Sequence, residues 1–274
     1  MKIGIIGFGY VGSALAYGLK KFGHEIKICD IDKEKIKTAK RSFKATEKVE
    51  NLLDSEIIFI CVPTPSKKDG SCDTSIVENV VIELANKIKK RTIIVIKSTI
   101  IPGTTDKLIT KNKNSKISIL VNPEFLRAKT ALKDFLTPDR IVIGGYDRRA
   151  MKVLAKIYEP FNTPIVLTEP KIAEMVKYAS NAFLATKVSF ANQIKLICDK
   201  LKINSKEVMK IVTMDHRIHP SHLDPTKGPY EGPCLPKDIL ALIKKAKEVS
   251  SPIYLLEGVE KINNLLKFDQ YNPS

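Results

Sequence analysis

The sequence has no apolar run approaching the roughly 18 residues of a membrane-spanning helix, and its N-terminus lacks a signal-peptide pattern. We therefore expect no membrane association and a cytoplasmic location. The five cysteines are odd in number and scattered, with no CxxC pair. This spacing argues against a disulfide framework and indicates reduced thiols. No internal repeat or low-complexity tract occurs among the 274 residues.

Negative charge is scarce, since 30 acidic residues stand against 46 basic ones, for a formal net charge of +16. A basic surface attracts anions, which include nucleic acids as well as anionic cofactors and substrates. The chain has neither an arginine-rich arm nor a basic ribbon interleaved with aromatic residues. We therefore expect no nucleic-acid partner.

Strand-like and helix-like segments alternate over the first 168 residues. The continuous apolar runs at 57–62 and 92–96 are typical of buried parallel strands, whereas 74–89 carries apolar residues at helical spacing. This alternation predicts an α/β fold with an N-terminal, doubly wound Rossmann domain at residues 1–168.

After Glu169, the alternation of strand-like and helix-like segments ends and helical patterns follow. Residues 171–201 contain no proline or glycine and carry apolar residues at helical spacing, which predicts one helix of about thirty residues. Shorter helices follow it, separated by a Pro-rich loop. We expect a second, all-helical domain at residues 169–274, built around the one long central helix.

A dinucleotide fingerprint, Gly7-Phe8-Gly9-Tyr10-Val11-Gly12, lies where the first strand ends and a helix begins. Glycines at these positions permit a tight turn and a close approach of the backbone to a pyrophosphate at the helix N-terminus. Asp30 follows Gly12 by 18 residues, at the end of the next strand, where a carboxylate binds ribose hydroxyls and repels a 2′-phosphate. The pattern predicts NAD rather than NADP.

Three further loops follow buried strands, at the edge of the sheet where open α/β folds bind ligands. They are Val62-Pro63-Thr64-Pro65, Lys97-Ser98-Thr99-Ile100-Ile101-Pro102-Gly103-Thr104-Thr105 and Asn122-Pro123-Glu124-Phe125-Leu126. Taken alone, Glu124 is more simply interpreted as a solvated charge than as a functional residue.

Two groups in the second half have the chemistry of a catalytic site. Lys177 and Asn181 are four apart on the long helix and share one face, so they can stabilise an oxyanion, although a solvated face is the simpler interpretation. Cys234 precedes a helix whose first turn contains Lys237 and Asp238. A helix N-terminus stabilises a thiolate, but an inert loop cysteine also fits.

The triplet His216, His219 and His222 has an HxxHxxH spacing, yet Pro220 and Pro225 make the segment a loop rather than a helix. We expect no metal site there. A loop role or a substrate contact stays open for these histidines.

In this order, the motifs GFGYVG, VPTP, KSTIIPGTT, NPEFL, TPDRIVIGG, EMVKYASNAFLATKVSFAN and GPCLPKD resemble the UDP-glucose/GDP-mannose dehydrogenase family. The resemblance covers about residues 1–248. It implies an NAD-dependent oxidoreductase that oxidises the C6 alcohol of a nucleotide sugar, by default UDP-glucose, to the carboxylate (UDP-glucuronate) with two NAD in turn.

The resemblance also implies roles for the catalytic residues. Cys234 corresponds to the nucleophile that forms a thiohemiacetal and then a thioester, and Asp238 to the carboxylate that acts through water as a general base. Lys177 and Asn181 correspond to the oxyanion stabilisers. Two further residues match the hydrolysis and water-holding positions of the family: Glu124 would promote thioester hydrolysis, and Thr99 would hold a water.

The family pattern further assigns binding residues. Lys35 resembles the basic residue on the adenosine side, and Arg217 the arginine that reaches the substrate of a neighbouring subunit. The predicted cofactor contacts are Gly7, Phe8, Gly9, Tyr10, Val11, Gly12, Asp30, Lys35, Val62, Pro63, Thr64, Ser98, Thr99 and Lys237. The predicted substrate contacts are Phe125, Leu126, Lys177, Asn181, Arg217 and Tyr230.

Two departures from the family are visible in the sequence. The glycine-rich GFGGxC that usually precedes the nucleophile is replaced by Gly228-Pro229-Tyr230-Glu231-Gly232-Pro233-Cys234, whose prolines should stiffen the loop. The C-terminal domain that binds the nucleotide half of the substrate is expected to be absent, because 36 residues follow Asp238. A separate chain could supply it, and the long helix at 171–201 should form a homodimer.

Two other functions remain open at this stage. One is a single-step NAD-dependent dehydrogenase of a small 3-hydroxy acid, since related enzymes combine a Rossmann domain, a long helix and a Lys-xxx-Asn pair without a catalytic cysteine. The other is a non-catalytic NAD-binding subunit that needs a partner. Cys234 with Lys237 and Asp238 argues against the first, although the expected absence of the C-terminal domain argues for it. The presence of Cys234, Lys177, Asn181 and Asp238 argues against the second.

Overall fold

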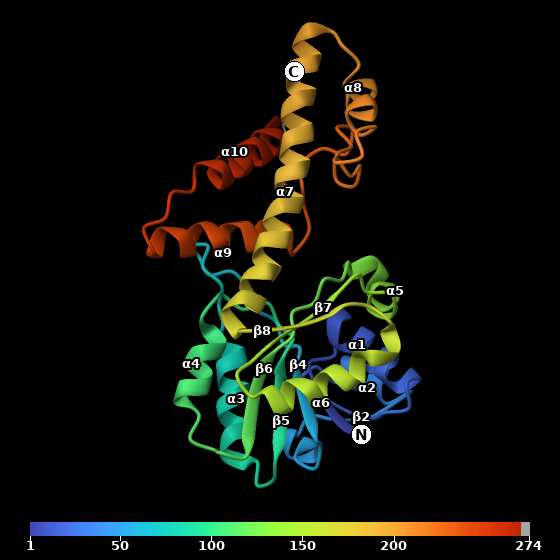
Figure 1. Ribbon diagram of the computed structural model, residues 1–274, viewed down its shortest axis with the longest axis vertical. Coiled ribbons are helices and arrows are strands. Elements are labelled where there is room, and N and C mark those ends of the chain that lie inside the picture. Colours follow the sequence, from blue (N-terminus) through green and yellow to red (C-terminus); the bar gives the residue numbers. More distant parts are fainter. Residues whose placement is uncertain (270–274) are drawn as a thin grey trace. The chain divides into compact units, whose positions relative to one another are not determined.

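The computed structural model describes residues 1–269, which pack as two compact units (Figure 1). The first unit comprises Met1–Pro65 and Asp73–Lys177, and the second comprises Ser66–Cys72 and the chain from Tyr178 onward. The boundary falls inside one continuous helix, α7 (Pro170–Leu201). No helix within residues 1–269 is long and apolar enough to cross a membrane.

The first unit contains one eight-stranded sheet in the order β3-β2-β1-β4-β5-β6-β7-β8. Neighbouring strands are parallel except at the β6–β7 pairing, which is antiparallel. The strands are β1 (Lys2–Ile6), β2 (Glu25–Cys29), β3 (Lys44–Thr46), β4 (Ile57–Ile60), β5 (Thr92–Ile96), β6 (Ile117–Val121), β7 (Ile141–Gly144) and β8 (Ile165–Thr168). The doubly wound α/β fold expected from the sequence is confirmed.

Helices cover both faces of this sheet. They are α1 (Tyr10–Lys21), α2 (Lys33–Ala39), α3 (Ser75–Lys87), α4 (Thr104–Lys111), α5 (Ala131–Leu136) and α6 (Arg148–Tyr158), with short 3₁₀ turns η1 (Val49–Leu52), η2 (Ala128–Thr130) and η3 (Glu159–Phe161).

Alternate residues of the central strands face opposite layers of helices. Ile57 and Phe59 of β4 pack in a core with α1, α5 and α6, whereas Ile58 and Ile60 pack in a second core with α3 and α4. All four β4 side chains are fully buried. This two-sided burial explains why the central strands are continuous apolar runs rather than alternating ones.

The second unit is helical in the part of the chain that the structure describes. Besides the later turns of α7 it contains α8 (Ser205–Val212), α9 (Leu235–Glu248) and α10 (Tyr254–Asp269). One small core joins Ala182 and Ala185 of α7 to Ile239 of α9 and Val259 of α10. The long central helix expected from the sequence is confirmed, and the loop expected between α8 and α9 carries no helix or strand.

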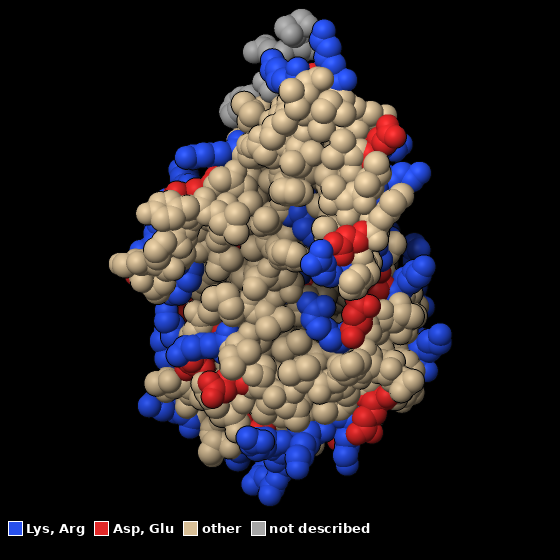
Figure 2. Space-filling view, turned by 45° about the horizontal axis from the view of Figure 1, so that its top comes forward, with Lys and Arg blue, Asp and Glu red and all other residues tan. Residues whose placement is uncertain are grey.

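Lysine and arginine side chains are scattered over the face drawn in Figure 2, with acidic side chains among them. They do not gather there into one continuous ribbon. The excess of positive charge is thus distributed over much of this face rather than concentrated on one element.

Candidate active site

The loop between β1 and α1 depends on glycine at two of its three fingerprint positions. Gly7 has a φ of +93°, and a Cβ there would lie 2.5 Å from the Cys61 carbonyl oxygen. A Cβ on Gly12 would overlap the Gly7 carbonyl oxygen. In contrast, nothing lies within 4 Å of the Cβ position of Gly9, the residue that precedes α1. The loop is therefore tight on its inner side and open at the helix N-terminus.

No side chain caps α1, and its first turn carries no acidic residue. The amide groups at a helix N-terminus bind anions, and a bare glycine lets a phosphate reach them. This N-terminus therefore fits the pyrophosphate of a dinucleotide.

Asp30 ties this loop to the end of β2. Its carboxylate, which is 7% exposed, accepts hydrogen bonds from the backbone amides of Phe8 (2.6 Å) and Asp32 (2.9 Å). Asp32 in turn caps the N-terminus of α2, and Lys35 lies on the exposed side of that helix, 3.8 Å from the Asp32 carboxylate. The structure thus holds a fixed carboxylate at the end of β2, where the sequence predicts a contact with ribose hydroxyls.

The loops after β4 and β5 are held together by two side-chain hydroxyls. Ser98 donates to the Val62 carbonyl at 2.6 Å, and Thr64 donates to the Thr99 carbonyl at 2.8 Å. Because Ser98 and Thr64 are buried, these bonds fix the two loops against each other at the carboxyl edge of the sheet.

Glu124 and Lys177 form a buried ion pair at the same edge. Lys177 Nζ donates to Glu124 Oε1 at 2.9 Å, and both side chains are 5% exposed. The other carboxylate oxygen accepts the Leu126 amide at 2.6 Å. Arg140 lies over the ring of Phe125, with its guanidinium carbon 4.1 Å from the ring centroid. The structure therefore brings Glu124, Phe125, Leu126 and Lys177 together, although the residues come from positions up to 53 apart.

A buried hydrogen-bond network centred on Asn122 lies behind this pair. Lys97 and Asn122 belong to the loop motifs after β5 and β6, but the sequence alone did not mark them as site residues. Lys97 Nζ donates to Asn122 Oδ1 (3.1 Å), which also accepts the Tyr158 hydroxyl (2.6 Å), while Asn122 Nδ2 donates to the Val142 carbonyl (2.7 Å). Burial lowers the pKa of Lys97 to about 8, and it raises the pKa of the nearby Cys61 thiol to about 12. The network joins β5, β6, β7 and α6 beneath the Glu124 turn.

Glu174, on α7, was also not singled out. Its carboxylate accepts the backbone amides of Gly103 (2.6 Å) and Thr105 (2.8 Å) and so caps the N-terminus of α4. Burial raises the pKa of this carboxyl group. The capping bond holds the far end of the loop that begins with Ser98 and Thr99.

In the second unit, Cys234 is the residue that precedes α9, and it is half-buried. Its carbonyl accepts the Asp238 amide at 3.0 Å, in the first turn of that helix. The Asp238 carboxylate is almost fully buried and accepts two hydrogen bonds of 2.6 Å, one from Asn181 Nδ2 and one from Lys237 Nζ. Cys234, Asp238, Asn181 and Lys237 thus form one cluster within this unit.

The remaining predicted contacts lie elsewhere in the second unit. Arg217 is exposed and pairs with Asp215. Tyr230 is 4% exposed and its hydroxyl donates to Glu260. Within residues 1–269, no three His, Cys, Asp or Glu side chains converge in a metal-ligating arrangement, so the HxxHxxH histidines form no such group there.

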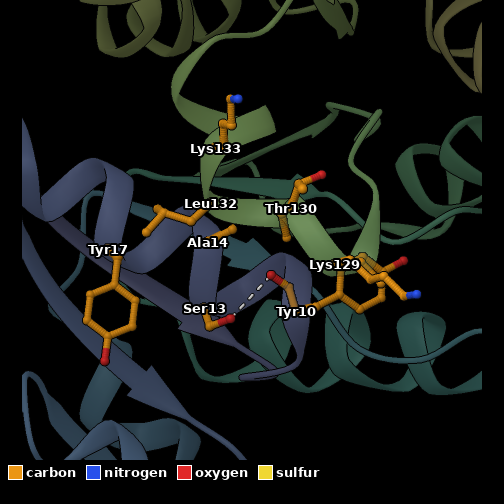
Figure 3. A pocket seen from close by; sticks show the side chains of 10 residues that line it. Tyr10, Ser13, Ala14, Tyr17, Lys129, Thr130, Leu132 and Lys133 are labelled. Atoms are coloured by element: carbon orange, nitrogen blue, oxygen red, sulfur yellow. Dashed lines mark hydrogen bonds between the residues drawn. The ribbon is translucent and has the colours of Figure 1, made fainter.

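A pocket of about 420 Å³ lies in the first unit, between α1 and the segment that follows the Glu124 turn (Figure 3). The Ser13 hydroxyl donates to the Tyr10 carbonyl at one wall. The pocket is lined by Tyr10, Ser13, Ala14, Tyr17 and residues 128–133. Open space therefore adjoins Tyr10, the first residue of α1 and a predicted cofactor contact.

These features define a class of protein. A largely parallel sheet, an uncapped α1 N-terminus behind a glycine turn, and a carboxylate at the end of β2 are the parts of a dinucleotide-binding oxidoreductase. Within the second unit, a thiol precedes α9 and a buried carboxylate lies in the first turn of that helix.

The chain belongs to the UDP-glucose/GDP-mannose dehydrogenase family. The family's NAD binding domain matches residues 1–45 and 38–162, and its central domain matches residues 171–265. NAD is therefore the cofactor, and the family consists of NAD-dependent oxidoreductases that act on CH–OH groups.

Individual relatives are named as UDP-glucose or GDP-mannose 6-dehydrogenases. UDP-glucose 6-dehydrogenase YwqF of Bacillus subtilis (strain 168) is 37% identical over 96% of this chain and 66% of its own length. GDP-mannose 6-dehydrogenase of Pseudomonas aeruginosa is 32% identical over 96% of this chain and 68% of its own length. The chain thus spans about two thirds of the length of the relatives it matches.

Solved structures agree with this assignment. The UDP-glucose dehydrogenase from the hyperthermophilic archaeon Pyrobaculum islandicum superposes with a TM-score of 0.89 at 31% identity, over 96% of this chain and 68% of that one. A 3-hydroxyisobutyrate dehydrogenase of Mycobacterium tuberculosis shares the fold at 16% identity, with a TM-score of 0.79 over 98% of this chain and 94% of that one.

Proposed function

We propose that this chain oxidises the C6 alcohol of a nucleotide sugar to a carboxylate in two successive two-electron steps, with UDP-glucose as the first substrate to test. The observation that carries the proposal is the cluster on α9, where Cys234 precedes the helix and Asp238 is buried one turn later. An alcohol dehydrogenase that stops at the aldehyde or ketone needs no such thiol. The names of the relatives supply the substrate class.

NAD, when bound, supplies the hydride acceptor for each oxidation. The fingerprint loop and the α1 N-terminus would hold its pyrophosphate, and Asp30 would hold the adenosine ribose. The bonds of Ser98 and Thr64 keep the neighbouring loops in place beside this cradle.

Cys234 provides the covalent step. Its sulfur adds to the C6 aldehyde and forms a C–S bond, giving a thiohemiacetal whose oxidation leaves a thioester. Water then cleaves the C–S bond, releasing the carboxylic acid and regenerating the thiol. Asp238 serves the water-mediated proton transfers, because its carboxylate is held by Asn181 and Lys237 one turn from the nucleophile.

Charge that develops on the C6 oxygen needs hydrogen-bond donors. Lys177 and Asn181 both belong to α7, at a spacing of four, and provide an ammonium and an amide group. Glu124 keeps the Lys177 ammonium in place through its 2.9 Å bond and serves thioester hydrolysis. Thr99 holds a water through its side chain.

The proposed assembly is a cytoplasmic homodimer through α7. Phe183, Phe190 and Ile197 are 65%, 51% and 47% exposed and are spaced by seven residues, so they form one apolar stripe along this helix. A second copy of the chain would cover the stripe and bring Arg217 to the neighbouring substrate. Phe183→Lys should therefore convert a dimer to a monomer in light scattering, and an unchanged mass would contradict the dimer.

A second polypeptide is the other proposed partner. It would bind the nucleotide half of the substrate, the role that the family resemblance gives to a separate domain. Addition of such a polypeptide should lower the KM for UDP-glucose, and an unchanged KM would argue against the partnership.

Cys234→Ser tests the proposed chemistry directly. The variant should lose net oxidation of UDP-glucose while its NAD dissociation constant stays within about twofold of the wild-type value, because the cradle belongs to the other unit. Cys198→Ser is the matched control, since Cys198 is a buried thiol on α7. Wild-type turnover in Cys234→Ser would refute the assigned nucleophile.

A further inference from the structure

The loop that precedes Cys234 is tied to α10 by its backbone. The Tyr230 amide donates to Asn263 Oδ1 at 2.7 Å, and Asn263 Nδ2 donates back to the Tyr230 carbonyl at 3.2 Å. Asn263 is fully buried and Tyr230 is 4% exposed. A single buried amide therefore satisfies both backbone groups of Tyr230, which a loop residue would otherwise expose to water.

The Tyr230 side chain is engaged by the same helix. Its hydroxyl donates to Glu260 Oε2 at 2.6 Å, and Lys267 Nζ lies 5.9 Å from the ring centroid. Burial, followed by the bond to Glu260, raises the pKa of the Tyr230 phenol, so it remains a donor at neutral pH. Tyr230 thus makes main-chain and side-chain bonds to one surface of α10.

A second amide holds the start of the loop. Asn192 Nδ2 donates to the Gly228 carbonyl at 2.8 Å. Pro229, between these two attachment points, has a fixed φ and no amide hydrogen to satisfy. The backbone at 228–230 is therefore held from α7 on one side and from α10 on the other.

Only three residues separate Tyr230 from Cys234. Gly232 has a φ of +81°, and Pro233, which directly precedes Cys234, has a φ fixed by its ring. Beyond the cysteine, α9 begins at Leu235. The position of Cys234 is consequently determined by two anchors, the first turn of α9 and the attachment of Tyr230 to α10.

We propose that Asn263 is a positioning residue that sets Cys234 for nucleophilic attack by holding Tyr230, with Glu260 as its side-chain counterpart. This role for Tyr230 differs from the substrate contact that the sequence predicts. The inference rests on the proposed function, in which Cys234 is the nucleophile. Where the family pattern has a glycine-rich loop before the nucleophile, this chain has a loop with two prolines, whose backbone is held by Asn192 of α7 and Asn263 of α10.

Asn263→Ala tests the proposal with two measurements that need no turnover. Amide hydrogen exchange of the 228–234 peptide should accelerate by about tenfold or more, because the Tyr230 amide loses its acceptor. The rate of Cys234 alkylation by iodoacetamide, followed by peptide mass spectrometry, should rise by about fivefold as the half-buried thiol becomes accessible. Lys261→Ala, at an exposed position of α10, should change neither rate by more than about twofold.

Steady-state kinetics separates positioning from a general loss of structure. In Asn263→Ala, kcat should fall by about tenfold or more while KM and the NAD dissociation constant stay within about threefold. Asn263→Asp keeps an acceptor for the Tyr230 amide but places an oxygen against the Tyr230 carbonyl, so it should show an intermediate loss. It also serves as the test variant if Asn263→Ala fails to fold.

Two outcomes would overturn the inference. Wild-type exchange and alkylation rates in both Asn263 variants would show that α10 does not hold the loop. Faster exchange with an unchanged kcat would show that the attachment does not position the nucleophile. If the wild-type protein does not oxidise UDP-glucose at all, the proposed function fails, and the exchange and alkylation rates still decide whether the loop is anchored.

Discussion

Disrupting the ion pair between Glu124 and Lys177 should reveal how strongly the first unit depends on its buried charges. The two side chains are 5% exposed and joined by one bond of 2.9 Å. Replacing one partner of a buried pair leaves an uncompensated charge and costs about 3–5 kcal/mol. Glu124→Gln should lie at the upper end of that range, because it leaves both Lys177 and the nearby buried Lys97 without the carboxylate.

The double variant separates the ion pair from general damage to the core. Lys177→Met alone should cost about 3 kcal/mol, since Glu124 keeps the Leu126 amide as a donor. Glu124→Gln with Lys177→Met should be about 2 kcal/mol more stable than the sum of the single effects predicts, because neither charge of this pair is left without its partner. Against a total stability of about 5–15 kcal/mol, each effect is readily measured.

Urea denaturation of the four proteins, followed by circular dichroism, gives the coupling free energy. The exposed pair of Glu34 and Lys37, whose atoms are 4.0 Å apart, is the matched control and should show no measurable coupling. Additivity within about 0.5 kcal/mol at the Glu124 and Lys177 positions would refute the reasoning, because it would mean that the two charges do not interact in the folded protein.

Three further predictions concern the cofactor cradle and the network behind it. Gly12→Ala should destabilise the protein by about 1–3 kcal/mol in urea denaturation, because the added Cβ overlaps protein atoms. Gly9→Ala, whose Cβ meets no protein atom, should leave stability unchanged and weaken NAD binding measured by calorimetry. An equal loss of stability in the two variants would contradict this reasoning. Burial lowers the pKa of Lys97 from 10.5 to about 8, so the folded protein binds fewer protons than the unfolded chain in this window. Wild-type stability should therefore rise by up to about 3 kcal/mol relative to Lys97→Met from pH 8 to pH 10.5 in paired denaturation curves, and parallel curves would contradict the burial of the charge. Asp30→Ser should weaken NAD binding by about tenfold and reduce the preference over NADP in a binding titration, and an unchanged preference would remove Asp30 from cofactor selection.

Most of the sheet could be predicted because its signals are local. The run at 92–96 was placed to the residue, as β5, since β-branched apolar residues fill a strand that is buried on both faces. β3 was not predicted, because three residues beginning with Lys44 carry no such pattern at the edge of the sheet. α5 was missed for a similar reason, as its six residues are too few for a helical period.

The residues of the candidate site could be predicted only where they belong to one local sequence motif. The turn at Gly7 and the first turn after Cys234 are local motifs with a recognisable spacing. The partners of Glu124 and Asp238 lie 53 and 57 residues away on α7, so only the folded chain shows that they meet. The attachment of Tyr230 to α10 likewise depends on packing, because a lone asparagine in a helix has no distinguishing sequence signal.

The number of NADH formed for each sugar consumed tests the central claim most directly. Purified protein, NAD and a limiting amount of UDP-glucose should yield about two NADH per sugar, with the sugar recovered as the C6 carboxylate, because the thiohemiacetal on Cys234 must be oxidised before hydrolysis. A yield of one NADH per sugar, with an aldehyde or ketone as the product, would contradict the covalent mechanism.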